Sequence, residues 1–228
     1  MAHRQAVAPS ADATARAGEV LRRLQDAYGP VAWQPRMAPL DELVFTILTQ
    51  HTSDVNAGKA FRQLRERFPR WEDLLEAPLD AIEEAIRVAG LGRQKALRIQ
   101  EALRGIMGRR GLLELDFLRD MPLEEAKAWL RALPGVGPKT AAIVLCFALG
   151  RPAMPVDTHV HRVARRLGLL HPKDNAEKAH ALLEGMVAPE QVYPFHVYLI
   201  THGRRVCKAQ RPRCGECVLR DMCPSRRV

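Results

Sequence analysis

The chain has 228 residues, of which 47% are hydrophobic, enough for a core in one large domain or two small ones. No segment approaches the roughly 20 apolar residues of a membrane-spanning helix, and the N-terminus lacks an apolar signal-peptide core, so we expect a globular cytoplasmic protein without membrane contact. The formal net charge of +9 indicates a polyanionic partner such as a nucleic acid.

Apolar residues recur at helical spacing along almost the whole chain, and no run of strict alternation indicates a strand. The predicted fold class is therefore all-α. Gly, Pro and helix-capping residues separate the helical segments. We expect helices at about residues 11–28, 41–50, 54–67, 79–89, 93–108, 123–133, 138–149, 158–168, 175–187 and 190–202.

A Gly-Leu-Gly loop at residues 90–92 precedes one of these helices. We expect Leu91 to be exposed at the tip of the loop, where an apolar side chain can wedge into a base stack that is being opened. The alternative is a leucine that packs back into the core.

A second loop of this kind has the sequence Leu-Pro-Gly-Val-Gly-Pro-Lys-Thr, at residues 133–140. Gly135 and Gly137 flank Val136 and are expected to allow a tight turn with positive φ that leaves backbone N–H groups uncovered. Pro138 suits the first position of the following helix, whose N-terminus attracts anions. Such a helix–hairpin–helix can grip a nucleic-acid phosphate without reading a base; a plain interhelical turn is the alternative.

The helix that follows, at 138–149, is apolar almost all round and should run through the core, with Cys146 as a buried packing residue. Lys139 lies in its first turn, where the positive end of the helix dipole and partial desolvation both disfavour an ammonium. A partly neutral lysine is a usable nucleophile that forms a Schiff base with a sugar C1′ or an aldehyde. A surface contact to phosphate is the alternative.

Asp157 precedes an apolar stripe at helical spacing, so it is predicted to cap the helix at 158–168. A carboxylate fixed at a helix start can also stabilise developing positive charge or accept a proton. His159 and His161 have no third ligand in view, which favours capping, core or phosphate contacts over a metal site.

Four of the five cysteines lie close together near the C-terminus, at Cys207, Cys214, Cys217 and Cys223. In a reducing cytosol such a cluster favours metal binding over disulfides. The single CxxC pair, flanked by lone cysteines, differs from two zinc knuckles and suits a compact iron–sulfur site. The surrounding Lys and Arg residues indicate a phosphate-binding surface, with a solvated basic tail as the alternative.

Taken together, LPGVGPKTA at 133–141, VDTH at 156–159 and C-x6-C-x2-C-x5-C at 207–223 resemble the endonuclease III branch of the helix–hairpin–helix DNA glycosylases, which remove oxidised pyrimidines. The resemblance extends from about Leu40 to Cys223.

The resemblance implies a helix–hairpin–helix DNA glycosylase fold with two domains. The expected six-helix barrel spans 31–152, and the expected iron–sulfur cluster domain combines 1–30 with 153–228.

It also implies the site residues. Lys139 would displace the damaged base and form the Schiff base, Asp157 would activate it or stabilise the sugar cation, and β-elimination would cleave the strand on the 3′ side. The four clustered cysteines would hold a [4Fe–4S] cluster. The expected DNA contacts are Gln50 and Leu91, which would fill the gap left by an everted base, together with Gly135, Val136, Gly137, Lys208, Arg211 and Arg213.

The expected activity is that of a bifunctional DNA glycosylase/AP lyase of base excision repair, because adenine mismatch relatives usually carry Ser and thymine mismatch relatives Tyr in place of Lys139. Its partner would be double-stranded DNA with damaged pyrimidines or abasic sites, bound by a monomer at a bacterial nucleoid. His51 and Pro138 depart from the family pattern and bear on opposite-base preference and phosphate contacts. The alternatives are a mismatch-type glycosylase and a DNA-binding or redox-sensing iron–sulfur paralogue with little catalysis.

Overall fold

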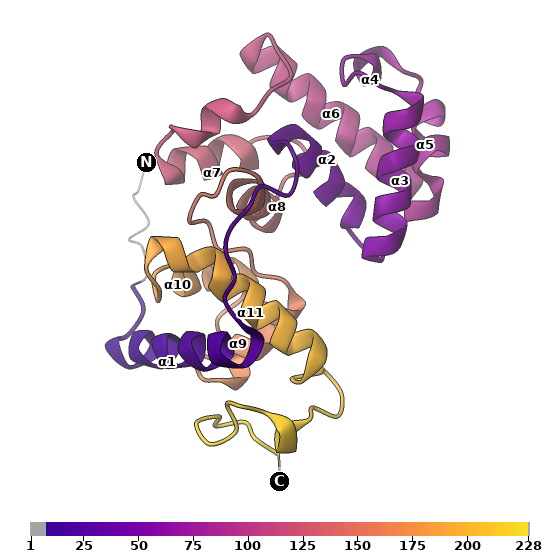
Figure 1. The fold of residues 1–228 in the computed structure, drawn as a ribbon. Coiled ribbons are helices and arrows are strands. Elements are labelled where there is room, and N and C mark those ends of the chain that lie inside the picture. The colour runs from indigo at the N-terminus through magenta and orange to yellow at the C-terminus, as the bar shows by residue number, and fades with distance from the viewer. Residues whose placement is uncertain (1–7, 228) are drawn as a thin grey trace. The chain divides into compact units, whose positions relative to one another are not determined.

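The computed structural model describes residues 8–227, and every regular element in that range is helical (Figure 1). The predicted all-α class is confirmed. The α-helices are α1 Ala11–Tyr28, α2 Pro39–Thr49, α3 Asp54–Arg67, α4 Asp73–Glu76, α5 Leu79–Ile86, α6 Gly92–Arg110, α7 Leu123–Arg131, α8 Pro138–Ile143, α9 Thr158–Arg166, α10 Ala176–Glu184 and α11 Val192–Arg205. Shorter helical turns are η1 Arg87–Ala89, η2 Asp116–Arg119, η3 Val144–Ala148, η4 Pro189–Gln191 and η5 Cys214–Glu216, of which η3 is π-helical.

The chain divides into two compact units. Residues 35–149 form what we call the central unit, and the described residues 8–34 together with 150–227 form the terminal unit. No helix in the described part of the chain is long and apolar enough to cross a membrane.

The central unit is built around α2, which packs against α3, α6, α8 and η3. Pro39 opens α2 at a position where its missing N–H costs no hydrogen bond. Leu43, Ile47 and Leu48 are fully buried on this helix, and each such side chain stabilises the fold by about 1.5–3 kcal/mol. Cys146 in η3 is also fully buried, as predicted from the apolar character of its segment.

The core of the terminal unit lies between α9 and α11, and α1 packs against α11. Asp157 caps α9 by accepting a 2.7 Å hydrogen bond from the N–H of Val160, which confirms the predicted helix start. Val160 and Val163 on the inner face of α9 are fully buried. The Tyr198 hydroxyl donates to the Gly29 carbonyl oxygen at 2.8 Å and joins α11 to the end of α1.

Candidate functional site

The predicted phosphate-binding hairpin connects α7 to α8. Gly135 has φ +74°, whereas Gly137 is extended at φ −89°, so only the first glycine has the expected positive φ. The N–H groups of both glycines donate to no acceptor in the described part of the chain. Two open N–H groups next to a helix start can bind an anion.

Val136, which was expected to contact DNA, lies at the centre of this hairpin. Its side chain is only 6% exposed, and its N–H donates to the Leu133 carbonyl oxygen at 3.2 Å. The residue therefore anchors the turn in the core and offers no uncovered N–H group.

Lys139 occupies the second position of α8, directly after the hairpin, and its side chain is exposed. The sequence argument assumed partial desolvation of this amine, and the structure does not provide it. What the fold does provide is an accessible primary amine at a helix N-terminus. Asp157, its expected partner, is half-buried and belongs to the terminal unit, whereas Lys139 belongs to the central unit.

The Leu91 loop and Gln50 also belong to the central unit. Leu91 is 54% exposed, which excludes the alternative of a leucine packed into the core. Gln50 is half-buried at the end of α2, and its Oε1 accepts a 2.7 Å hydrogen bond from Arg98 Nη1. A Cβ atom on Gly135 would lie 3.0 Å from Cγ of the same arginine. Arg98 of α6 therefore joins Gln50 to the hairpin, although the sequence analysis did not single it out.

Backbone strain is concentrated in the loops that were expected to contact DNA. The described non-glycine residues with positive φ are His51 at 54°, Leu91 at 52° and Arg211 at 50°. This conformation costs a non-glycine residue about 1–2 kcal/mol, and residues with such strained backbones are often found at functional sites. Each of the three strained residues is either a predicted contact or, like His51, the neighbour of one.

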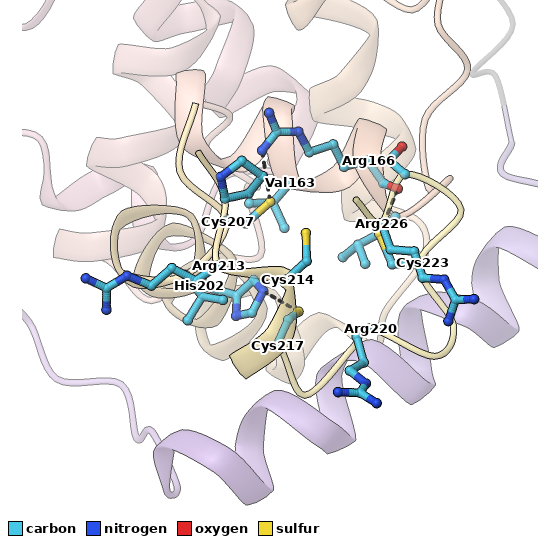
Figure 2. A pocket seen from close by; sticks show the side chains of 14 residues that line it. Val163, Arg166, His202, Cys207, Arg213, Cys214, Cys217, Arg220, Cys223 and Arg226 are labelled. Atoms are coloured by element: carbon cyan, nitrogen blue, oxygen red, sulfur yellow. Dashed lines mark hydrogen bonds between the residues drawn. The ribbon is translucent and has the colours of Figure 1, made fainter. Parts of the chain in front are cut away.

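The four clustered thiols line one pocket of the terminal unit (Figure 2). Cys207 follows α11, Cys214 opens η5, and Cys217 and Cys223 lie in the turns after it. The described residues that line the pocket include four arginines and no carboxylate.

Hydrogen bonds to sulfur further define this pocket. Arg166 Nη1 donates to Cys207 Sγ at 3.3 Å, and His202 Nε2 lies 3.4 Å from Cys217 Sγ (Figure 2). Burial raises the pKa of the Cys217 thiol and of the Cys223 thiol, so a bound cation must displace their protons.

Four thiols, lining arginines and N–H groups near sulfur fit an iron–sulfur cluster. No group of three or more His, Cys, Asp or Glu side chains is arranged to hold one metal ion within residues 8–227. N–H donors and cations beside the thiols would stabilise the negative charge of a thiolate-bound cluster.

The loop between Cys207 and Cys214 carries three exposed basic side chains, those of Lys208, Arg211 and Arg213. Arg166 on α9 donates to the carbonyl oxygens of Lys208 at 2.7 Å and Ala209 at 3.0 Å. The loop is thus fastened to α9 as well as to the thiol pocket. Sequence reasoning found the basic residues but not the arginine that holds them, because its acceptors are backbone atoms.

Comparison with known proteins agrees with this fold and this pocket. Residues 44–189 match the model of the HhH-GPD superfamily base excision DNA repair proteins, and residues 207–223 match the iron–sulfur binding domain of endonuclease III. The class defined by the fold and the site is a base excision repair DNA glycosylase with an iron–sulfur binding domain.

Individual similar proteins indicate which family within this class the chain resembles. A putative DNA glycosylase of Arabidopsis thaliana is 39% identical to this chain. The alignment covers 72% of this chain and 56% of the Arabidopsis protein. Endonuclease III of Thermotoga maritima is 37% identical over 81% of this chain and 82% of its own length. The solved structure of a trapped endonuclease III–DNA covalent intermediate matches with a TM-score of 0.80 and 30% identity, over 93% of this chain and 96% of that chain.

The chain therefore belongs to the endonuclease III family within the HhH-GPD superfamily. This membership confirms the predicted resemblance, the helix–hairpin–helix glycosylase fold and the predicted enzyme class, DNA glycosylase/AP lyase.

Proposed function

We propose that the protein excises oxidised pyrimidines from double-stranded DNA and then cleaves the resulting abasic site through a lysine Schiff base. The observation that carries this proposal is the exposed amine of Lys139 directly behind the hairpin with its open N–H groups. A hairpin that holds a backbone phosphate would bring the neighbouring sugar within reach of that amine. A member of the same family has been trapped as a covalent intermediate with DNA, which supports a covalent route here.

The chemistry requires an everted nucleotide, because the sugar C1′ is inaccessible inside a duplex. Lys139 Nζ forms a bond to C1′ as the glycosidic C–N bond breaks, and the departing base takes the electron pair and a proton. The amine loses its proton, the sugar ring opens, and a Schiff base remains. Removal of a C2′ proton then expels the 3′ phosphate, and water releases the lysine.

Asp157 is proposed to serve the same reaction from the start of α9. Its cap hydrogen bond uses Oδ1, and this bond holds the carboxylate in one orientation. A fixed negative charge stabilises the cationic sugar of the transition state, or accepts the proton that the amine loses.

We further propose that the iron–sulfur cluster is of the [4Fe–4S] type, with Cys207, Cys214, Cys217 and Cys223 as its ligands. When bound, the cluster would join four points of one short segment and so fix the loop between the first two cysteines. The exposed Lys208, Arg211 and Arg213 of that loop would then contact DNA phosphates without reading sequence.

Borohydride trapping tests the proposed function. Duplex DNA with a thymine glycol or an abasic site should form a covalent adduct with the native protein, and Lys139→Ala should abolish the adduct while retaining DNA binding. Lys173→Ala, which removes an exposed lysine of the terminal unit, is the matched control and should still form the adduct.

Other outcomes would favour another function. An adduct that persists in Lys139→Ala would overturn the assignment of the nucleophile. Base release without nicking would indicate a mismatch-type glycosylase, and tight binding without base release would indicate a DNA-binding paralogue. A lesion panel scored for both base release and nicking separates these cases.

A further inference from the structure

The first turns of α6 carry two cationic side chains that hold separate loops of the central unit. Lys95 and Arg98 are three residues apart and so lie on neighbouring positions of one helix face. Lys95 is 1% exposed, and its Nζ donates to the carbonyl oxygen of Leu48 at 2.9 Å and to that of Ala89 at 2.8 Å.

Both acceptors of Lys95 lie at the C-terminal ends of helical segments. Leu48 is in the last turn of α2, and Ala89 is the last residue of η1. Carbonyl groups at these ends lack intrahelical partners and carry the negative end of the helix dipole, which favours a cation. Burial lowers the pKa of Lys95, and the two carbonyl dipoles offset part of the cost of a buried ammonium.

The two carbonyl groups lie shortly before the residues that were expected to enter DNA. Gln50 lies two residues after Leu48, and Leu91 lies two residues after Ala89. The backbone N–H of Lys95 also donates to the Leu91 carbonyl oxygen at 3.0 Å. Lys95 thus hydrogen-bonds the backbone at Ala89, before the strained Leu91, and at Leu91 itself. It also hydrogen-bonds the last turn of α2, which precedes Gln50.

Arg98 extends this arrangement to the hairpin. Its Nη1 donates to Gln50 Oε1, and its aliphatic stem lies against Gly135. The end of α2, the Leu91 loop and the hairpin are therefore tied to the same helical face.

We propose that Lys95, assisted by Arg98, is a positioning residue that holds Leu91 and Gln50 ready to replace an everted nucleotide. This inference rests on the proposed function and deepens it. Because the strain at Leu91 is compensated during folding, DNA binding does not have to supply that free energy, and the wedge is in place when the duplex arrives. Loss of Lys95 should therefore impair base eversion more than duplex binding.

The test substitutes Lys95→Met, which keeps the length of the side chain and removes both carbonyl hydrogen bonds. Arg104→Met is the matched control, since Arg104 on the same helix also donates to a carbonyl oxygen, that of Leu75, away from these loops. Eversion is followed by 2-aminopurine fluorescence opposite a non-cleavable abasic analogue, and chemistry by single-turnover nicking of abasic sites in duplex and in single-stranded DNA.

Lys95→Met should lower the eversion signal and slow duplex nicking by about 10–100-fold, the usual cost of a misplaced positioning group. Duplex affinity and single-stranded nicking should change less than about threefold, a difference below 1 kcal/mol. Arg104→Met should leave all four measurements near the native values.

Two results would overturn the proposal: native eversion in Lys95→Met, or an equal loss of duplex and single-stranded nicking. If Lys95→Met does not fold, Arg98→Leu serves instead, and an unchanged eversion signal in that variant counts against the proposal. Because the analogue is not cleaved, eversion remains measurable even if the native protein excises no lesion. Failure of the positioning role is thus distinguishable from failure of the proposed function.

Discussion

At the scale of single residues, the two hairpin glycines have different structural requirements. Gly135 combines φ +74° with a position where a Cβ atom would press on Arg98, whereas Gly137 has φ −89° and open space around it. Only the first position needs glycine for the fold.

This difference makes a paired prediction for stability. Gly135→Ala should lower the free energy of unfolding by about 1–2 kcal/mol or more, because alanine tolerates neither the left-handed backbone nor the contact. Gly137→Ala should be neutral, or stabilising by less than about 1 kcal/mol, through reduced freedom of the unfolded chain. Urea denaturation of both variants measures the difference, and equal effects would contradict the structural distinction.

His202 connects helix α1 to the thiol pocket. The Tyr28 hydroxyl lies 2.9 Å from its Nδ1, and Cys217 Sγ lies 3.4 Å from its Nε2. If Cys217 is a ligand of the proposed cluster, its thiolate only accepts hydrogen bonds, so the ring proton would lie on Nε2 and the tyrosine would donate to Nδ1.

His202→Leu should therefore weaken the hold on the cluster and lower its reduction potential, because an N–H donor to sulfur stabilises the reduced state. We expect the visible absorbance of the cluster to decay about 10-fold faster during incubation with a chelator. Tyr28→Phe, which leaves the imidazole in place, should have a smaller effect. An unchanged potential and decay rate in His202→Leu would mean that the contact has no influence on the cluster.

Sequence reasoning succeeded at the residue scale where the signal is local. Asp157 was found as a cap from the apolar stripe that follows it, and the cysteine cluster from its spacing. Lys95 and Arg98 were missed because one partner of each, Leu48 and Gln50, lies 47 and 48 residues away and is brought near by the packing of helices. Nothing in the sequence near a buried lysine indicates which distant carbonyl it will meet.

At the scale of helices, α1 carries an ionic cluster on its exposed side. Glu19 accepts hydrogen bonds from Arg22 and Arg23, and Arg23 also reaches Asp221 in the C-terminal turns. The hydrogen bonds from these two arginines lower the pKa of Glu19 from 4.5 to about 2.

This shift predicts a pH dependence. Because the folded-state pKa is below the unfolded value, the stabilising contribution of Glu19 is present above about pH 4.5 and disappears as the pH falls towards 2. The difference in Tm between the native protein and Glu19→Gln should follow that course. It should be small and should shrink in high salt, because the group is exposed. A difference that grows below pH 4 would contradict the assignment.

The helix boundaries in the structure differ in part from those predicted from the sequence pattern. The segment predicted as one helix at 79–89 is α5 followed by η1, and Gly90 with φ +67° ends it. Segments as short as α4 and η5 were not predicted, because four residues or fewer are too short to show a repeated helical pattern. The missed turns matter for function, since η5 begins at one of the clustered cysteines.

At the scale of the whole molecule, the basic loop after α11 should contribute to affinity for any DNA sequence. Replacing Lys208, Arg211 and Arg213 with Ala should reduce the slope of log K against log salt by about 0.9 per lost phosphate contact, or about 2.7 for all three. Arg22→Ala is the control, because Glu19 and Asp26 already neutralise that charge. Fluorescence anisotropy across a salt series measures the slope, and an unchanged slope would remove the loop from the interface.

The division of the chain into units also has a consequence for its biosynthesis. On the ribosome α1 emerges first, but the apolar side chains of Val20 and Leu24 pack into a core that includes α11. At about 5–20 residues per second, the nascent helix waits on the order of 10–40 s for that partner. All residues of the central unit, 35–149, are synthesised before α11. The four clustered cysteines follow α11 in the sequence, so the proposed cluster site is complete only after all the described α-helices have been synthesised.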